Sequence, residues 1–354
     1  MNKRQDLIYM QRCLELAKKG LGATYPNPMV GAVIVHKGKI IGEGWHKKAG
    51  TPHAEVNAIH QVTNKSQLNE STLYVNLEPC SHVGKTPPCA DLIIEYRIPR
   101  VVIASTDPNP LVSGRGIKKL IASGCKVETH VLHKQSDFLN RRFFTFHQKK
   151  RPYIILKWAQ TKDSFIAPLP SEKNEAEIFW ISNPISKQRV HQWRSEEAAI
   201  LVGVQTLVQD NPQLTTREWN GKNPLRLVLD PNARSPKKSI AVTDKEPTIF
   251  FTKNKTEAFS GIKKQVALNP FSINSILNYC YENQIQSIIV EGGLKTIQSF
   301  IDTDMWDEAR VFTSEKKLDR GVKAPIIKKS FTQTEQIESD LLSFNFNETF
   351  QAKN

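Results

Sequence analysis

Three side chains of the kind that bind zinc constrain this chain most, because a shared metal ion would force them together in the fold. His53 opens a His-Ala-Glu run, Cys80 follows Glu-Pro, and Cys89 follows two prolines. One imidazole and two thiolates leave the fourth tetrahedral position of zinc for water, which is the arrangement of a catalytic site. The alternatives are two buried cysteines beside an unrelated histidine, or a structural zinc site with a further ligand.

Glu55 lies two residues after the histidine and is not needed as a ligand. A carboxylate there could take a proton from the zinc-bound water and pass it to a leaving nitrogen. Thr51 and Pro52 predict a helix N-cap followed by proline at the first helical position. The two prolines before Cys89 predict the start of a second helix. Helix N-termini favour anions and would help to keep thiolate and carboxylate ionised.

The spacing of the zinc-binding residues resembles that of the riboflavin-pathway pyrimidine deaminases. The general signature of zinc deaminases is H-x-E followed by P-C-x-x-C. Here eight residues, rather than two, separate Cys80 from Cys89. The types of ligand, their order and the flanking prolines agree with a deaminase site.

The length of 354 residues predicts two domains. A hydrophobic content of 39% and a charged content of 24% are typical of an ordinary globular protein. No apolar run approaches the ~20 residues that cross a bilayer, and the polar N-terminus argues against a signal peptide, so we expect a cytoplasmic protein. Five cysteines in a chain of this length do not indicate a disulfide framework.

The net charge of +14 suits either nucleic acid or phosphorylated small molecules. The basic pairs are scattered, without an arginine-rich tract or interleaved aromatic residues, so we interpret most of them as solvated surface. A nucleic-acid deaminase that acts on a flipped base is a rival hypothesis. It would need a basic groove with stacking aromatics, and it leaves residues 152–354 unexplained.

Strands and helices alternate through residues 1–147, which predicts an α/β layered sheet. Lys37 and Gly38 would form the turn of a hairpin. The predicted strands are 29–35, 40–45, 72–77, 100–105 and 126–132, and the predicted helices are 4–19, 53–60, 88–96 and 117–123.

A turn-rich segment, residues 107–116, follows a predicted strand directly, where sites of α/β proteins usually lie. With Asn27 and Lys85 it extends the resemblance, so that residues 1–147 resemble the deaminase half of the bifunctional riboflavin deaminase–reductase family, a cytidine-deaminase-like three-layer domain. The alternative is that Asn27 and Asp107 only build turns. The resemblance implies that the aminopyrimidine and its ribose phosphate are bound by Asn27, His46, Lys85, Asp107 and Asn109.

A second α/β pattern begins at Pro152, after a basic and aromatic run, residues 143–151, that we interpret as a short junction. Glu291 and two glycines end its last predicted strand, and a helix would follow. Backbone N–H groups at such a helix start can bind phosphate, although a plain strand-to-helix turn explains the motif equally well. The predicted strands are 153–159, 198–202, 226–230, 248–252 and 287–290, and the predicted helices are 184–194 and 272–282.

Together with the runs around Trp180, Arg194, Thr206 and Asp210, this motif resembles the reductase half of the same family. That half is a dihydrofolate-reductase-like domain and uses NADPH. The resemblance implies that the cofactor is contacted by Ala159, Trp180, Thr206, Asp210, Gly293, Leu294, Lys295 and Thr296. It implies that the substrate, whose phosphate suits guanidinium groups, is contacted by Arg194, Leu214, Arg217 and Glu291.

The second half also departs from the family. Its usual run after the first strand is Ser/Thr-x-Asp-Gly and then a basic residue, but Ser164 and Phe165 stand at the last two positions here. Ile178 and Pro231 replace two serines of the family. These changes affect the expected edge of the substrate and cofactor pocket. The alternative hypothesis is an active deaminase whose reductase-like domain only binds ligand or builds the oligomer.

The resemblance covers almost the whole chain, as a deaminase domain of residues 1–147 and a reductase domain of residues 151–354. It implies riboflavin biosynthesis, with zinc-dependent hydrolysis of the 2-amino group of 2,5-diamino-6-ribosylamino-4(3H)-pyrimidinone 5′-phosphate. NADPH-dependent reduction of the ribosyl chain to a ribityl chain would follow. We therefore expect Zn²⁺ and NADPH as cofactors and phosphorylated pyrimidines as partners. We expect neither nucleic acid nor membrane, and a homo-oligomer, either a dimer or a tetramer.

Overall fold

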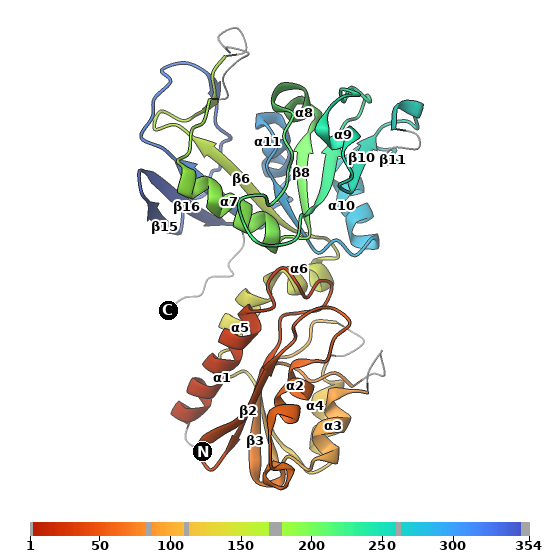
Figure 1. The fold of residues 1–354 in the computed structure, drawn as a ribbon, viewed down its shortest axis with the longest axis vertical. Helices are drawn as coiled ribbons and strands as arrows, with labels where there is room; N and C mark the ends of the chain where they lie inside the picture. Colours follow the sequence, from red (N-terminus) through yellow and green to blue (C-terminus); the bar gives the residue numbers. More distant parts are fainter. Residues whose placement is uncertain (1–2, 82–86, 110–112, 170–178, 260–262, 348–354) are drawn as a thin grey trace. The chain divides into compact units, whose positions relative to one another are not determined.

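The computed structural model describes residues 3–81, 87–109, 113–169, 179–259 and 263–347 of the chain (Figure 1). These residues form two compact units, one that ends at Lys150 and one that begins at Arg151. None of the helices in the described ranges is long and apolar enough to cross a membrane. Each unit is described separately.

The first unit contains a five-stranded sheet in the order β2-β1-β3-β4-β5. The strand β1 pairs antiparallel with β2 and β3, whereas β3, β4 and β5 run parallel. Lys37 and Gly38 both have positive φ between β1 and β2, as the predicted hairpin turn requires. The strands are β1 (Gly31–His36), β2 (Lys39–Trp45), β3 (Ser71–Leu77), β4 (Arg100–Ser105) and β5 (Lys126–Glu128).

Helices cover both faces of this sheet, so the first unit has three layers. Ala32 and Ile34 of β1 pack in one core with Ala58 of α2, and that core also includes residues of α3 and α4. Val33, the residue between them, points to the opposite face and packs with Met10 of α1. The helices are α1 (Lys3–Lys18), α2 (Ala54–Gln61), η1 (Lys65–Glu70), α3 (Cys89–Glu95), α4 (Arg115–Ala122), α5 (His133–Leu139) and α6 (Arg141–Lys149).

Two predictions for the first unit were wrong. The strand expected over 126–132 ends at Glu128, because His130 and Leu132 adopt positive φ and a strand cannot continue through that conformation. The expected junction over 143–151 is mostly the helix α6, in which Phe143 and Phe144 are buried against Leu77 of β3. The helices η1 and α5 were not predicted.

The second unit contains a nine-stranded sheet in the order β11-β10-β9-β8-β12-β6-β13-β16-β15. The strands from β11 to β13 in this order run parallel, and β16 and β15 are antiparallel to their neighbours. The main-sheet strands are β6 (Tyr153–Gln160), β8 (Ala199–Gly203), β9 (Leu225–Leu229), β10 (Thr248–Thr252), β11 (Lys264–Ala267), β12 (Ser287–Val290), β13 (Glu308–Thr313), β15 (Gln333–Ile337) and β16 (Asp340–Phe346); β7 (Phe165–Ala167) pairs with β14 (Val322–Lys323) in a separate ribbon.

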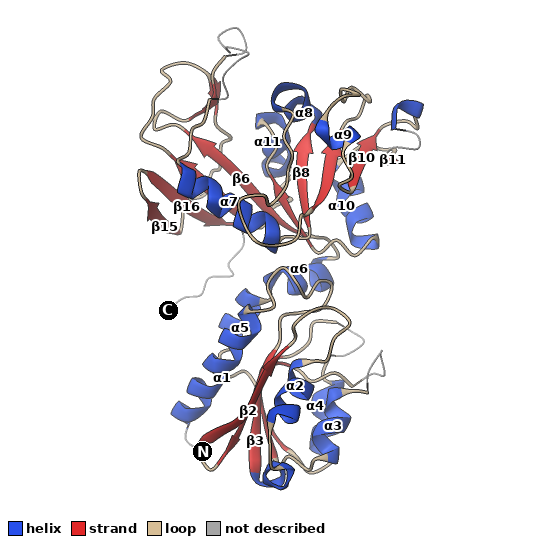
Figure 2. Cartoon of the chain, viewed as in Figure 1, coloured by secondary structure: helices blue, strands red, loops and turns tan. Residues whose placement is uncertain are grey.

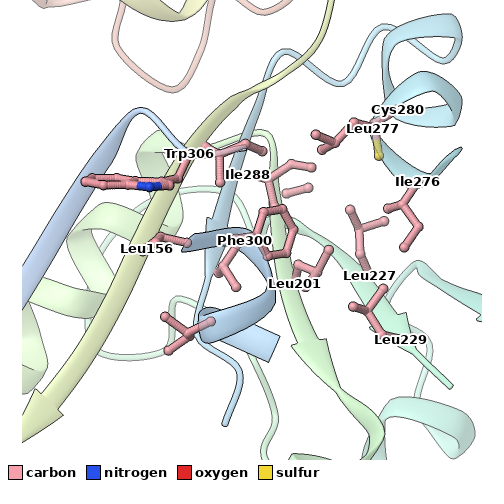
Figure 3. Packing of buried hydrophobic residues seen from close by; sticks show 14 of the residues in the cluster. Leu156, Leu201, Leu227, Leu229, Ile276, Leu277, Cys280, Ile288, Phe300 and Trp306 are labelled. Carbon is pink, nitrogen blue, oxygen red and sulfur yellow. The ribbon is translucent and has the colours of Figure 1, made fainter. Parts of the chain in front are cut away.

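Helices again lie on both faces of the main sheet, in agreement with the predicted second α/β domain (Figure 2). Leu156 of β6 points to the core that includes Phe300 (Figure 3). Its neighbour Ile155 points to the opposite core, which includes Trp193. The first core is covered by α10 (Ile273–Glu282) and α11 (Leu294–Asp302), and the second by α7 (Pro184–Glu196), α8 (Val204–Asp210), α9 (Ile240–Thr243) and η3 (Glu257–Phe259).

Candidate active sites

The three predicted zinc ligands come together in the first unit, although they belong to three different elements. His53 immediately precedes α2, Cys80 lies beyond the end of β3, and Cys89 is the first residue of α3. The Nδ1 atom of His53 lies 3.6 Å from the sulfur of Cys80 and 3.3 Å from that of Cys89. All three ligand atoms lie within 4.8 Å of one another.

This geometry fits zinc. Bonds of about 2.0 Å to nitrogen and 2.3 Å to sulfur, at a tetrahedral angle, place the two ligand atoms about 3.5 Å apart. The sulfur of Cys80 also accepts a hydrogen bond of 3.3 Å from the backbone N–H of Cys89. Hydrogen bonds from Cys89 hold the pKa of the Cys80 thiol well below its usual range, and His53 adds to this effect. A thiolate, the form that binds zinc, is therefore favoured there.

Glu55 lies in the first turn of α2, beside the three ligand atoms but outside their group. Its side chain is buried, with a relative exposure of 3%. Burial raises the pKa of Glu55, although the nearby His53 opposes the shift. A raised pKa suits a carboxyl group that must both accept and donate a proton.

The predicted cap of α2 was wrong. Thr51 was expected to be the N-cap, with Pro52 at the first helical position, but the N-cap is His53 itself and the helix begins at Ala54. The hydroxyl of Thr51 instead donates to the carbonyl of Lys48 at 2.7 Å. The second predicted start was correct, since Pro88 is the N-cap of α3.

His46 and Asn27 lie beside the zinc ligands. The ring of His46 contacts that of His53 edge-on, with centroids 5.4 Å apart. Because the carbonyl of Pro52 can only accept, the Nδ1 of His46 donates to it at 3.2 Å. The Nε2 of His46 lies 3.0 Å from the side-chain amide nitrogen of Asn27 and accepts from it, and burial lowers the pKa of His46, which favours this tautomer. The Asn27 side chain is therefore hydrogen-bonded to a residue that contacts the predicted ligand His53.

Asp107 and Asn109 lie on the loop after β4, and Asp107 is close to Cys80. Asp107 accepts a hydrogen bond of 2.8 Å from the backbone N–H of Asn109, which is an Asx turn. Burial raises the pKa of Asp107 to about 6, and the neighbouring charges of Glu78 and Cys80 contribute. Glu78 accepts from the backbone N–H of Asp107 at 3.2 Å. Lys85 lies outside the described residues.

In the second unit, Arg194 and Glu291 form a buried ion pair. The Nε and Nη2 atoms of Arg194 each donate to a different carboxylate oxygen of Glu291 at 2.8 Å, and its Nη1 donates to the carbonyl of Thr215 at 3.1 Å. The ammonium of Lys157, on β6, lies 3.8 Å from Glu291. Burial alone would raise the pKa of Glu291, but Arg194 and Lys157 outweigh it and lower the pKa to about 2.

Two helix starts with a glycine N-cap lie side by side on neighbouring strands. Gly203 is the last residue of β8 and the N-cap of α8, and Gly293 is the N-cap of α11 and follows β12, the adjacent parallel strand. A Cβ atom on Gly203 would lie 2.5 Å from the hydroxyl of Thr296, and one on Gly293 would lie 4.0 Å from that of Thr206. The predicted residues Thr206 and Gly293–Thr296 therefore form one group, with backbone N–H groups suited to phosphate.

The other predicted reductase residues lie in different places around the second sheet. Leu214 is buried and precedes Thr215, the partner of Arg194, whereas Arg217 is exposed and lies 3.9 Å from Glu218. Ala159 lies near the end of β6, and Asp210 ends α8. Trp180 precedes α7 with 48% of its surface exposed, and the ammonium of Lys187 lies 4.1 Å from its ring centre.

The structure gives a physical account of two departures from the family. Ser164 has φ of 65°, so it adopts the left-handed conformation that the family's glycine would adopt without strain. Phe165 pairs with Lys323 on β14, whose ammonium lies 4.0 Å from the ring centre. A positive charge is thus present next to the position where the family has a basic residue. Pro231 follows β9 and accepts from the N–H of Lys253, and Ile178 lies outside the described residues.

Two residues of these sites were missed by the sequence analysis. Glu78 was noted only as part of the Glu-Pro-Cys run, and the signal that pointed to it was an acidic residue directly after an apolar strand. Lys157 was passed over as a member of a predicted strand, although a lysine among apolar residues of a buried strand is itself a signal.

The fold and the sites define a bifunctional enzyme, a zinc-binding deaminase joined to an α/β reductase. Two family models agree with this division. The cytidine and deoxycytidylate deaminase zinc-binding region matches residues 3–105, and the RibD C-terminal domain matches residues 152–318.

The chain belongs to the RibD family of riboflavin biosynthesis proteins. It is 42% identical over 328 residues to the riboflavin biosynthesis protein RibD of Aquifex aeolicus, and the match covers 91% of this chain and 90% of that protein. It is 39% identical to RibD of Actinobacillus pleuropneumoniae, over 94% of this chain and 89% of that protein. The chain is therefore both a hydrolase and an oxidoreductase of riboflavin biosynthesis, and its reductase half implies a nicotinamide cofactor.

Solved structures show the same fold over both halves. A diaminohydroxyphosphoribosylaminopyrimidine deaminase/5-amino-6-(5-phosphoribosylamino)uracil reductase from Thermotoga maritima is 37% identical, with a TM-score of 0.86 over 97% of this chain and 98% of that chain. RibD of Acinetobacter baumannii is 30% identical, with a TM-score of 0.88 over 98% of this chain and 99% of that chain.

Proposed function

We propose that the first unit hydrolyses the 2-amino group of 2,5-diamino-6-ribosylamino-4(3H)-pyrimidinone 5′-phosphate and releases ammonia. The observation that carries this proposal is the group formed by His53, Cys80 and Cys89, with the buried Glu55 beside it. The name of the Thermotoga maritima relative describes a deaminase of a phosphoribosylaminopyrimidine, which supports the choice of substrate. Zinc, when bound by the three ligands, supplies a Lewis acid that activates water.

The other residues of the first unit bind the substrate and move protons. Glu55 takes a proton from the attacking water and passes it to the leaving amino group, a role for which its raised pKa is suited. His46 holds the amide of Asn27 in one orientation, so that its oxygen is available for the pyrimidine. The pyrimidine and its ribose phosphate are bound by Asn27, His46, Lys85, Asp107 and Asn109.

We propose that the second unit reduces the deaminated product to 5-amino-6-ribitylamino-uracil 5′-phosphate. NADPH, when bound, supplies a hydride to C1′ of the ring-opened ribose. The adjacent glycine-capped helix starts of α8 and α11 are suited to its phosphates. The proposed cofactor contacts are Ala159, Trp180, Thr206, Asp210 and Gly293–Thr296, and the proposed substrate contacts are Arg194, Leu214, Arg217 and Glu291.

Arg194 and Arg217 differ in what they can offer to the substrate phosphate. Arg194 already directs both arms of its guanidinium to Glu291 and Thr215, so it also fixes the position of that carboxylate. Arg217 has 41% of its side chain exposed and can turn toward an anion.

We further propose that the protein is a cytoplasmic homo-oligomer with domains of residues 1–147 and 151–354. It acts on phosphorylated pyrimidines and not on nucleic acid.

The test is to follow both reactions in the full-length, zinc-loaded chain. The diamino substrate should release ammonia, and NADPH should then be oxidised. Glu55→Gln should keep its zinc, but its rate of ammonia release should fall by a factor of about 10²–10⁴. General acid–base catalysis typically contributes a factor of this size. The same variant should still oxidise NADPH at the normal rate with the deaminated substrate. Unchanged ammonia release at full zinc occupancy would contradict the role of Glu55.

A further inference from the structure

We propose that Glu78 is a positioning residue of the deaminase, which holds the substrate-binding loop after β4 against the strand end that carries Cys80. This inference rests on the proposed function, because it assumes that Asp107 and Asn109 bind the pyrimidine phosphate. Glu78 lies two residues before Cys80, at the end of β3, and has a relative exposure of 4%.

The carboxylate of Glu78 binds four backbone N–H groups, two from the loop between β4 and α4 and two from the first turn of α4. One oxygen accepts from Asp107 at 3.2 Å and from Gly114 at 2.9 Å. The other accepts from Gly116 at 2.9 Å and from Ile117 at 3.3 Å. A single side chain thus connects Asp107, near the start of this loop, and Gly114, at its end, to the first turn of α4.

The backbone N–H of Glu78 donates to the carbonyl of Ser105, the last residue of β4, at 2.9 Å, so Glu78 is also held at the point where the loop begins. The first turn of α4 also lies directly against the strand end. A Cβ atom on Gly116 would lie 2.1 Å from the carbonyl oxygen of Pro79, so only glycine allows this approach. The residue between Glu78 and Cys80 therefore touches the start of α4 as well.

The negative charge of Glu78 is satisfied by these N–H dipoles, and the described residues provide no lysine or arginine ion pair to it. Hydrogen bonds from N–H groups to a buried carboxylate are strong and directional. A neutral amide in the same place would offer one acceptor oxygen, and its NH₂ group would face donors. Glu78→Gln should therefore loosen the loop without changing the size of the side chain.

Glu78 connects the part of the site that is proposed to bind substrate to the part that holds zinc. Asp107 and Asn109 are on the loop, whereas Cys80 is on the strand end, and His53 and Cys89 belong to α2 and α3. Loosening the loop should move the substrate contacts and leave the zinc ligands and Glu55 in place. The Michaelis constant should then rise more than the turnover number falls.

The test uses full-length, zinc-loaded protein and measures ammonia release from the diamino pyrimidine phosphate. Glu78→Gln should bind zinc fully and raise KM by about tenfold to a hundredfold, the cost of a lost charged hydrogen bond, with little change in kcat. NADPH oxidation with the deaminated substrate provides the reference in the same sample and should not change. The matched control is Glu70→Gln, because Glu70 pairs with Lys37 at the surface, with 61% of its side chain exposed.

Gly116→Ala provides a second test from the start of α4, and it leaves residue 78 a glutamate. The added methyl group collides with Pro79, so this variant should also raise KM while it keeps zinc. A normal KM in a zinc-loaded variant of either kind would overturn the inference, and so would loss of zinc in both variants, which would limit Glu78 to a role in folding. If the wild-type chain released no ammonia, the proposed function itself would be overturned.

Discussion

At the scale of single residues, the pKa of the buried Glu291 carboxylate is set by the basic side chains beside it. Its pKa of about 2 in the folded chain lies below the value of about 4.3 for an unfolded glutamate. A lowered pKa stabilises the fold above pH ~4.3, and this stabilisation is lost as the pH falls toward 2. Arg194 and Lys157 cause the shift in the pKa of Glu291. Removal of the Glu291 charge should therefore lower the free energy of unfolding most at neutral pH.

Glu291→Gln should therefore lower the free energy of unfolding of the second unit by about 3 kcal/mol at pH 7. The difference from wild type should shrink below about pH 4 and almost vanish near pH 2. Chemical unfolding of the two proteins at several pH values measures this. Glu315→Gln is the matched control, because Glu315 pairs with Lys162 at the surface and should change the stability little. An equal difference at pH 7 and pH 3 would contradict the assignment.

Ser164 allows a prediction about backbone strain. Its side chain is exposed and its φ is 65°, so substitutions act through the backbone and not through packing. The left-handed conformation costs roughly 1–2 kcal/mol for a residue with a Cβ atom, and more for a β-branched one. Ser164→Gly should therefore match or exceed the wild type in stability, and Ser164→Val should be the least stable of the three. Unfolding midpoints that do not follow this order would show that the turn has another conformation.

The sequence predicted individual residues well where residue type carries the chemistry. His53, Cys80 and Cys89 can be grouped before any fold is known, because few other roles combine an imidazole and two thiols with this order and these flanking prolines. Glu78 and Lys157 could not be assigned in this way. Their roles depend on burial and on partners far along the chain, such as Gly116 for Glu78 and Glu291 for Lys157.

At the scale of elements, most parallel strands of the two mixed sheets were predictable because they are continuous apolar runs. The strands β4, β10 and β12 have the predicted bounds. The strand β15 was not predicted because four of its five residues are exposed and polar. The strand β16 was not predicted because polar residues, Ser343 and Asn345, are among those it buries. Such strands are defined by pairing with a neighbour, which a local pattern does not reveal.

Two of the three predicted zinc ligands lie at the starts of helices, His53 at α2 and Cys89 at α3. Because the ligands connect two helices to the end of β3, bound metal should add to the stability of the first unit. Cys80→Ser and Cys89→Ser should each lower the zinc content and the melting temperature of this unit. The second unit should melt as before. Metal analysis and calorimetry of each variant measure these effects.

Cys125→Ser is the matched control for these variants. Cys125 is also a buried cysteine of the first unit, but it lies in the hydrophobic core and not in the ligand group. It should keep full zinc content whatever its effect on packing. If a chelator left both the ammonia release and the first melting transition unchanged, the metal assignment would be wrong.

At the scale of the whole molecule, each unit has cores of its own. The two cores of the second unit lie on opposite faces of its sheet and contain residues between Tyr153 and Phe344, and Figure 3 shows one of them. The cores of the first unit contain residues between Tyr9 and Phe144. A segment of about 150 or 200 residues is large enough to fold independently. The two activities should therefore separate at the boundary near Lys150.

A fragment of residues 151–354 should oxidise NADPH with the deaminated pyrimidine phosphate and remain inactive with the diamino form. In this fragment Arg217→Ala should raise KM by about tenfold to a hundredfold, since a lost charged hydrogen bond costs roughly 1.5–3 kcal/mol. Arg189→Ala is the matched control, because Arg189 is a partly exposed arginine of α7 that pairs with Glu335. A folded fragment that binds neither NADPH nor substrate would refute the proposed reductase domain. Equal activity on both pyrimidines would instead show that the second unit does not require prior deamination.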